Sequence, residues 1–160
     1  MTAGGSSIPE VQKLLSVLAT GRRVGEAGTA FGEGTRAMAS AAISVVTVEL
    51  DKARAESAGS ALRDLPNVEL LVGDWRELLP PRAPFDLVFL DAGGFKEDPE
   101  GVGEVAIGLL ECGGLLVADD MMPGLPDHDP VRRYMFEHPE LNAAEVLTSP
   151  TTSVLLGARV

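Results

Sequence analysis

Short apolar runs alternate with amphipathic stretches along the whole chain. The apolar runs are rich in valine, leucine and phenylalanine, as in strands that helices cover on both faces. Predicted strands of this kind begin after Gly21 and then cover residues 44–50, 68–72, 85–91 and 114–118. Apolar positions that recur every three or four residues predict the helices between these strands. The predicted helices cover residues 8–19, 35–42, 52–64, 101–110 and 130–137.

This order of strands and helices predicts an α/β fold, in which a doubly wound, Rossmann-like sheet carries helices on both faces. The pattern changes near the C-terminus, where residues 142–147 and 152–160 form apolar segments on either side of a Ser149-Pro150 turn. Consecutive strands joined by a short turn must be antiparallel. We therefore expect a mostly parallel sheet with a C-terminal antiparallel strand pair. The chain has no internal repeat or linker, which predicts a single domain over residues 1–160 with a frayed segment at residues 1–7.

Composition and charge narrow the range of partners. The 160 residues are 45% hydrophobic and 23% charged, as in an ordinary globular protein. The 13 basic and 24 acidic residues give a net charge of −11, which repels nucleic acid and anionic membranes. No membrane-spanning segment or signal peptide is evident, so we expect a cytoplasmic protein that acts on a small molecule. Cys112, the single cysteine, excludes an internal disulfide and is expected to pack near a helix end.

Closely spaced glycines follow the first predicted strand. Residues 24–34 read Val-Gly-Glu-Ala-Gly-Thr-Ala-Phe-Gly-Glu-Gly and lead into a predicted helix. Gly28 and Gly32 would let backbone N–H groups approach a ligand, and the helix would present its positive end to an anion. Glu49 closes the next strand about twenty residues on, where an acidic side chain can accept ribose hydroxyl protons. These features predict a pocket for a nucleotide-type cofactor.

Two classes of protein combine such a loop with an acid at the end of the second strand. They are the dinucleotide-binding dehydrogenases and the S-adenosylmethionine-dependent methyltransferases. Glu26 favours the second class, because its carboxylate would attract the ammonium group of a methionine moiety but would repel a pyrophosphate. The C-terminal antiparallel pair also favours the second class, because a dinucleotide-binding fold normally continues with helix-linked parallel strands.

Five segments in the same order resemble the class I S-adenosylmethionine-dependent methyltransferases. Within that superfamily the chain looks most like the small metal-dependent O-methyltransferases, which include catechol and caffeoyl-coenzyme A O-methyltransferases. The segments are residues 26–34, Val48-Glu49-Leu50-Asp51, Gly73-Asp74-Trp75, residues 85–91 and Leu116-Val117-Ala118-Asp119-Asp120. The resemblance covers nearly everything from Val24 to Val160.

The resemblance implies S-adenosylmethionine as the cofactor and names the residues that would hold it. Glu49 would bind the ribose, and Asp74 would accept a hydrogen bond from the adenine amino group, cap a helix, or do both. Trp75 would cover the adenine ring or simply pack as a wall of the pocket. Thr35 would cap the following helix or bind the methionine carboxylate. The implied cofactor-binding residues are Glu26, Gly28, Gly32, Gly34, Thr35, Glu49, Asp74 and Trp75.

Three aspartates, Asp91, Asp119 and Asp120, lie just beyond the carboxyl ends of neighbouring predicted strands, where open α/β sheets bind their ligands. Each aspartate alone could equally end a strand and begin a turn. Together they would repel one another unless a cation or protons intervened, and hard oxygen ligands suit Mg²⁺ or Ca²⁺. In the family that the chain resembles, these positions bind a divalent ion, here expected to be Mg²⁺. The resemblance implies that the ion lowers the pKa of an acceptor hydroxyl and aligns its oxygen with the methyl carbon.

The chain departs from that family at the candidate general base. The family has a lysine three residues after the first metal-binding aspartate, but Gly94 stands there and Lys96 follows two residues later. We therefore predict Asp91 and Lys96 as the catalytic residues, with a surface position for this lysine as the alternative. His128 and His138 are the other candidate bases.

A second departure is the short N-terminal region, in which one predicted helix at residues 8–19 precedes the first strand. The acceptor site is therefore expected to be shallow, or closed by a second subunit of a homodimer against the apolar face of this helix. The leading prediction is an O-methyltransferase that transfers a methyl group, with metal assistance, to a hydroxyl oxygen of a small molecule. The alternatives are a metal-independent methyltransferase and a non-catalytic S-adenosylmethionine-binding protein, and a dehydrogenase is a more distant one.

Overall fold

The computed structural model describes residues 7–123 and 129–160, apart from the side chain of Asp120. His128 and nearly all of the N-terminal segment expected to be frayed lie outside these residues. In chain order the elements are α1 (Pro9–Ala19), β1 (Arg23–Ala27), α2 (Glu33–Ala39), β2 (Ser44–Glu49), α3 (Lys52–Leu62), β3 (Val68–Val72), α4 (Trp75–Leu78), the 3₁₀ turn η1 (Pro80–Arg82), β4 (Phe85–Leu90), α5 (Pro99–Gly108), β5 (Leu110–Met121), α6 (Pro130–Glu137), β6 (Leu141–Leu147) and β7 (Ser153–Arg159).

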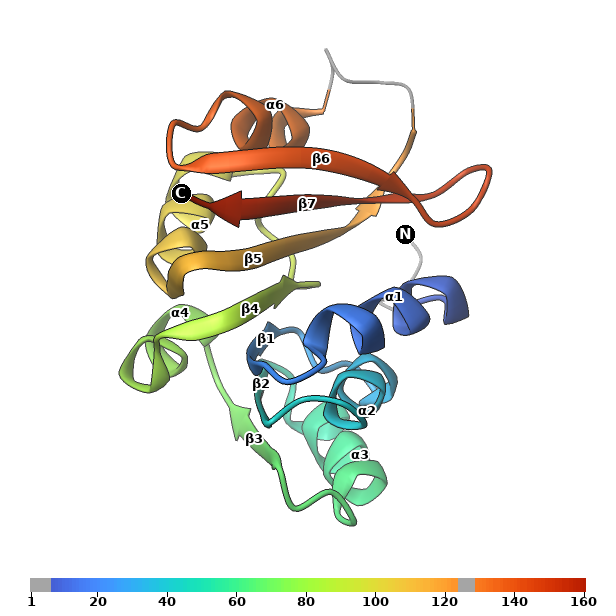
Figure 1. Ribbon diagram of the computed structural model, residues 1–160. Coiled ribbons are helices and arrows are strands. Elements are labelled where there is room, and N and C mark those ends of the chain that lie inside the picture. The colour runs from blue at the N-terminus through green and yellow to red at the C-terminus, as the bar shows by residue number, and fades with distance from the viewer. Residues whose placement is uncertain (1–6, 124–128) are drawn as a thin grey trace.

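Within the described residues, seven strands form one sheet in the order β3-β2-β1-β4-β5-β7-β6 (Figure 1). Strands β1 to β5 run parallel, whereas β7 pairs antiparallel with both β5 and β6. The predicted Rossmann-like sheet with a C-terminal antiparallel pair is confirmed. The strand order changes direction between β1 and β4, and such a switch point opens a crevice at the carboxyl ends of the strands.

Helix α1 packs on α2 and on one face of the sheet (Figure 1). Its side chains Val11, Leu15 and Ala19 are at most 1% exposed and share a hydrophobic core with Met38 of α2 and Phe89 of β4. The apolar side of α1 is therefore used inside the chain. The sheet and α2 already bury most of this side, which leaves little of it for a second subunit, and the expected homodimer stays a prediction.

The other face of the sheet carries α4, α5 and α6. Trp75, Ile107 and Met135 bring one buried side chain from each of these helices into a second core, which also contains Val88 and Leu116 of the sheet. Helices therefore cover both faces, as the alternation of strand and helix predicts. This arrangement leaves the carboxyl edge of the sheet open between the two layers.

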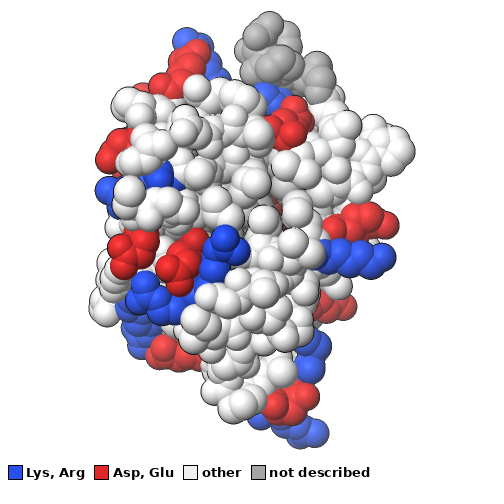
Figure 2. Space-filling view, in the orientation of Figure 1, with Lys and Arg blue, Asp and Glu red and all other residues white. Residues whose placement is uncertain are grey.

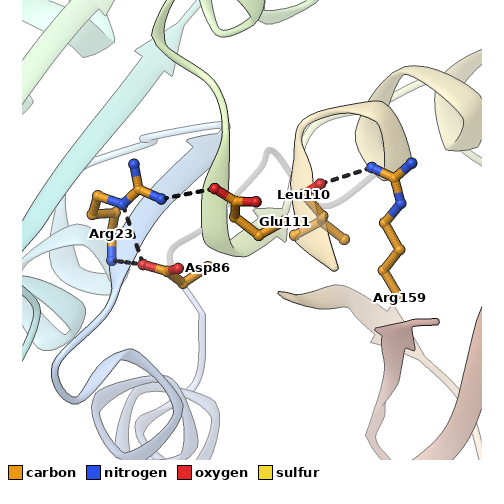
Figure 3. A network of polar contacts seen from close by, with 5 residues as sticks. All are labelled: Arg23, Asp86, Leu110, Glu111 and Arg159. Carbon is orange, nitrogen blue, oxygen red and sulfur yellow. Dashed lines mark hydrogen bonds and ion pairs between the residues drawn. The ribbon is translucent and has the colours of Figure 1, made fainter. Parts of the chain in front are cut away.

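Polar contacts connect the amino ends of β1, β4 and β5, on the edge of the sheet opposite the predicted site (Figure 3). At the start of β1, the Arg23 backbone N–H donates to Asp86 Oδ2 at 2.8 Å, and its guanidinium lies 3.4 Å from Glu111. Arg159 of β7 donates to the Leu110 carbonyl at 2.7 Å. Arg23 is thus an ion-paired residue at a strand entry. Figure 2 shows basic and acidic side chains interspersed on the face in view.

Cys112 and the lengths of the helices bear on two expectations from the composition. Cys112 is exposed in β5, so the expectation that it packs near a helix end is wrong. The strand begins earlier than the sequence pattern indicates, at Leu110, so that Cys112 lies in the sheet shortly after α5 ends at Gly108, with its side chain exposed and not packed. Among the described residues, no helix is long and apolar enough to cross a membrane.

Helices α5 and α6 pack closely at Gly103. A Cβ there would overlap the ring of Tyr134, which makes an edge-to-face contact with Phe95 and donates its hydroxyl proton to Glu104. We expect Gly103→Ala to lower the free energy of unfolding by about 1–3 kcal/mol, the usual cost of overpacking. Gly108 of the same helix faces open space, so Gly108→Ala is the matched control and should gain up to about 1 kcal/mol. Urea unfolding measures both variants, and a gain in stability for both would contradict the prediction.

Candidate functional site

A cavity of about 750 Å³ opens at the carboxyl ends of β1, β2, β3 and β4. This volume lies in the usual range for small-molecule sites. The segments that follow these strands form its wall, which includes Gly28, Glu49, Asp74, Trp75 and Asp91. The fold thus brings five residues that the sequence singles out into one cavity, at the switch point of the sheet.

Glu49 ends β2 in the wall of this cavity and is only 6% exposed. Its Oε2 accepts a hydrogen bond from the Ala30 backbone N–H at 2.9 Å, and its Oε1 accepts one from the Asp51 backbone N–H at 3.0 Å. These two bonds hold the carboxylate in one orientation. Each oxygen keeps a further acceptor site, so the pair can receive two neighbouring hydroxyl groups.

Asp74 follows β3 and is the N-cap of α4. Its Oδ1 accepts a hydrogen bond from the Arg76 backbone N–H at 2.9 Å, and the Arg76 guanidinium lies 2.7 Å from its Oδ2. The same guanidinium lowers the pKa of the Asp74 carboxyl. The capping role of Asp74 is therefore confirmed. Asp74 also borders the cavity, and its contact with a ligand stays a prediction. Trp75 is 8% exposed and packs in the core as a wall of the cavity.

Glu26 lies in β1 and is only 1% exposed. Burial raises the pKa of its carboxyl to about 7, although hydrogen bonds from the hydroxyls of Thr35 and Thr47 oppose the rise. The Thr35 hydroxyl donates to Glu26 Oε2 at 2.5 Å, and helix α2 has Gly32 as its N-cap without a side-chain cap. The expectation that Thr35 caps this helix is wrong, because its hydroxyl is committed to a buried carboxyl group.

Gly28 and Gly32 of the β1–α2 segment make backbone hydrogen bonds within the chain. The Gly28 N–H donates to the Val48 carbonyl and the Gly32 N–H donates to the Thr29 carbonyl, both at 2.9 Å. The N–H groups of these two glycines are therefore used within the chain. Gly28 still lines the larger cavity, so a close approach of this backbone segment to a ligand stays a prediction. Both glycines have a positive φ, +96° at Gly28 and +87° at Gly32. Residues other than glycine rarely adopt such a φ.

Because glycine has no side chain, Gly28 and Gly34 also leave room for groups from other parts of the chain. A Cβ at Gly28 would lie 2.8 Å from the carbonyl oxygen of Asp91, so glycine lets the loops after β1 and β4 meet. A Cβ at Gly34 would lie 3.3 Å from Glu26 Oε1, so glycine leaves space beside the buried carboxyl. The predicted residues that do not line the cavity are Glu26, Gly32, Gly34 and Thr35.

A second, smaller cavity of about 210 Å³ adjoins the first. Residues 91–94, between β4 and α5, line both cavities. The wall of the second cavity also includes Lys96 of the same loop and Asp119 near the end of β5. The structure therefore brings Asp91, Lys96 and Asp119 together beside the larger cavity.

Asp91 and Asp119 determine whether this place suits a metal ion. In the part of the chain that the structure describes, no three histidine, cysteine, aspartate or glutamate side chains form a group that could hold one. The side chain of Asp120, the third predicted ligand, lies outside that part. Mg²⁺ keeps several waters and is usually held by one or two carboxylates. Asp91 and Asp119, two carboxylate residues that line the smaller cavity together with Glu97, therefore fit Mg²⁺ chemically.

The candidate base His138 lies away from both cavities. His138 sits between α6 and β6, where its Nε2 lies 3.0 Å from Glu104 Oε1 and its Nδ1 accepts the Glu140 backbone N–H. It lines neither of the two cavities described above, so its role as a base is not supported. Lys96 is the candidate that borders the smaller cavity.

Two arginines of the larger cavity were missed in the sequence. Arg54 and Arg76 both border it, each from the first turn of a helix that starts at the carboxyl edge of the sheet. Their positions offered a signal, because Arg54 follows Glu49 by five residues and Arg76 follows Asp74 by two. Basic residues so close behind predicted ligand-binding acids could have been included in the site.

The chain is similar to curated methyltransferases over part of its length, while no family model matches it. It is 35% identical over 113 residues to the protein-L-isoaspartate O-methyltransferase of Burkholderia pseudomallei (strain 668), which covers 68% of this chain and 34% of the relative. The protein of the same name from Burkholderia thailandensis is also 35% identical over 113 residues, with 33% of its length covered. The chain thus spans about a third of the length of these relatives.

Solved structures are similar over nearly the whole chain. The O-methyltransferase TomG from Streptomyces achromogenes, involved in tomaymycin synthesis and solved in complex with S-adenosylmethionine, is 29% identical with a TM-score of 0.81, over 100% of this chain and 83% of its own. Cofactor-bound Rv0187 from MTB is 30% identical with a TM-score of 0.81, over 96% and 81% of the two chains. A Bacillus cereus O-methyltransferase in complex with S-adenosylhomocysteine, 22% identical with a TM-score of 0.79 over 99% and 84%, shares the fold. By its strand order, its cavity and these similarities, the chain belongs to the class I S-adenosylmethionine-dependent methyltransferases and resembles the O-methyltransferases among them.

Proposed function

We propose that the protein transfers the methyl group of S-adenosylmethionine to a hydroxyl oxygen of a small molecule, assisted by a divalent cation. The observation that carries this proposal is the wall that the two cavities share at residues 91–94. A cofactor in the larger cavity and an acceptor in the smaller one would meet at this loop. Proximity of this kind supplies much of the rate acceleration in a two-substrate reaction.

The larger cavity has the groups that an adenosine needs. Glu49 offers two oriented carboxylate oxygens to the ribose hydroxyls, and Asp74 offers an acceptor to the adenine amino group. Trp75 supplies an apolar wall. The TomG structure contains S-adenosylmethionine in the fold that this chain shares, which supports the same cofactor here.

The smaller cavity has the groups that a hydroxyl acceptor needs. In the transfer, the acceptor oxygen forms a bond to the methyl carbon, the S–CH₃ bond breaks with its electron pair going to sulfur, and the hydroxyl proton leaves. Lys96 is the proposed proton acceptor, because it borders the cavity beside Asp91. Asp91 and Asp119 would hold Mg²⁺, which when bound would lower the pKa of the acceptor hydroxyl.

A protein isoaspartyl group is the second candidate acceptor, because the curated relatives are named for it. This acceptor is a carboxylate. A carboxylate is already ionised at neutral pH, so it would leave Lys96 and the cation without the role that a hydroxyl acceptor gives them. A neutral hydroxyl compound fits this cavity better, and an isoaspartyl peptide belongs in the acceptor screen as the competing substrate.

Calorimetric titration with S-adenosylhomocysteine tests the cofactor assignment. We expect micromolar binding by the parent protein both in Mg²⁺ and in a chelator. Glu49→Ala should weaken binding at least about tenfold, since hydrogen bonds to a charged group contribute roughly 1.5–3 kcal/mol. Glu69→Ala is the matched control, because Glu69 lies on the neighbouring strand β3, pairs with Arg82 and does not line the cavity.

The outcomes separate the proposal from its alternatives. Absence of binding in both buffers would contradict the cofactor assignment, and NAD would then be titrated. Binding with turnover that survives chelation would indicate a metal-independent methyltransferase. Binding without transfer to any acceptor, including the isoaspartyl peptide, would indicate a non-catalytic binding protein.

A further inference from the structure

Arg76 borders the larger cavity directly beside the proposed adenine-binding residues. Asp74, Trp75 and Arg76 are consecutive, and all three belong to the cavity wall. Asp74 and Arg76 face each other as a charged pair, with side chains 31% and 54% exposed respectively. The guanidinium is therefore part of the surface that a cofactor base would meet.

The carboxylate of Asp74 accepts hydrogen bonds from two nitrogens of the Arg76 guanidinium. Its Oδ1 accepts hydrogen bonds from the Arg76 backbone N–H at 2.9 Å and from Nε at 3.0 Å. Its Oδ2 accepts hydrogen bonds from Nη2 at 2.7 Å and, more weakly, from Nε at 3.2 Å. Such a planar two-pronged contact fixes the orientation of a carboxylate, which a point charge does not.

These contacts leave a defined acceptor for a ligand. A carboxylate has about four lone-pair sites, and Arg76 offers it three protons, because the single Nε proton is shared between Oδ1 at 3.0 Å and Oδ2 at 3.2 Å. The Nε proton lies nearer to Oδ1, so the site that remains is on Oδ2. The Asp74 side chain is partly exposed in the cavity wall. The guanidinium also keeps Asp74 ionised by lowering the pKa of its carboxyl, so that the group accepts hydrogen bonds and does not donate them.

We infer that Arg76 is a specificity-determining residue of the cofactor site, which orients the Asp74 carboxylate so that the cavity accepts a 6-aminopurine and rejects a 6-oxopurine. The inference rests on the proposed function. An adenine amino group donates a proton to the remaining site on Oδ2, whereas the oxygen at the same position of hypoxanthine meets a fixed, negatively charged acceptor. A site built around one hydrogen bond discriminates against an analogue that leaves its polar group unpaired.

The test is the ratio of the dissociation constants of S-inosylhomocysteine and S-adenosylhomocysteine, measured by calorimetry. We expect the parent protein to prefer the adenine compound by at least about tenfold. Arg76→Ala should weaken S-adenosylhomocysteine about five- to tenfold and change S-inosylhomocysteine less than about twofold, so that the ratio falls toward one. Arg76→Lys should restore part of the ratio, because an ammonium group pairs with the carboxylate without its planar fork.

Arg82→Ala is the matched control. Arg82 holds Glu69 by the same kind of fork, at 3.0, 3.1 and 2.8 Å, but does not line the cavity. The Arg82→Ala variant should leave both dissociation constants unchanged. Asp74→Asn is an independent variant that should also lower the ratio, since the amide can donate to an oxygen at position 6 as well as accept from an amino group.

If Arg76→Ala weakens the binding of both ligands equally, the ratio of their dissociation constants stays unchanged. That result would overturn the inference alone and leave the proposed function in place. Absence of S-adenosylhomocysteine binding by the parent would overturn the proposed function together with the inference. Because the ratio compares two ligands on one variant, a general loosening of α4 would not produce the expected change.

Discussion

Replacing Asp119 by alanine is expected to abolish metal-dependent methyl transfer while S-adenosylhomocysteine still binds. Asp119 borders the smaller cavity with Asp91 and Lys96 and does not line the larger one. Loss of metal assistance removes several kcal/mol of transition-state stabilisation. Turnover should fall at least about 100-fold, since each 1.36 kcal/mol is a factor of ten. The measurement is methyl transfer to any acceptor that the screen identifies, with and without Mg²⁺.

A second measurement does not depend on the acceptor. Mn²⁺ can stand in for Mg²⁺, and electron paramagnetic resonance should detect its binding to the parent but not to Asp119→Ala. Asp86→Ala is the control, because Asp86 is an aspartate at the opposite edge of the same sheet and pairs with Arg23. Equal Mn²⁺ binding by parent and Asp119→Ala would contradict the metal assignment, and unfolding of Asp119→Ala would show that the carboxylate is structural.

Glu26 is expected to make both stability and cofactor binding depend on pH near neutrality. Burial raises the pKa of this carboxyl from 4.5 to about 7 in the folded protein. The folded state therefore holds the proton more tightly than the unfolded state does. This contribution to stability is complete below pH 4.5 and is lost as the pH rises through 7. The loss amounts to about 3 kcal/mol, which Glu26→Gln should remove from the pH profile of urea unfolding.

Glu26 does not line the larger cavity and is 1% exposed, so the contact with a cofactor ammonium group stays a prediction from the sequence, and it requires the ionised carboxylate. At pH 6 only about a tenth of a group with a pKa near 7 is ionised, so S-adenosylhomocysteine should bind about tenfold more weakly at pH 6 than at pH 8. Glu26→Gln should bind it weakly at both values. 5′-Methylthioadenosine lacks the amino-acid part and is the control ligand. The same pH dependence for this ligand would contradict an ammonium contact and leave Glu26 as a buried carboxyl that shapes the loop through Thr35.

The strand and helix pattern could be predicted closely because it depends on local periodicity. Residues 44–50, 68–72 and 85–91 were predicted as strands, and β2, β3 and β4 match them to within one residue at each end. The start of β5 was missed, because the polar and glycine residues around Cys112 hide a strand whose pairing partners come from β4 and β7. Helix α2 also begins earlier than expected, at Glu33, because Gly32 serves as its N-cap.

The predicted site was right about position and less accurate about individual roles. Glu49, Asp74 and Asp91 reach a common cavity because the carboxyl ends of parallel strands meet at one edge of the sheet. The role of Thr35 was wrong, because only the packing of α2 on β1 reveals that Glu26 lies within reach of its hydroxyl. Arg76 was missed although its place two residues after Asp74 offered a signal, because a solvated helix residue and a cavity residue look alike in sequence.

The sequence by itself determined the element order, the antiparallel end of the sheet and the acids that follow the parallel strands, because these depend on residue periodicity and on chemistry at strand ends. The tertiary structure alone decided which groups meet across the chain. It placed the loop after β1 against the backbone of Asp91, buried Glu26 beyond the reach of solvent, and covered the apolar side of α1 with the chain's own sheet. Burial, shared cavities and pKa values arise from contacts between distant segments, and no local pattern of residues encodes those contacts.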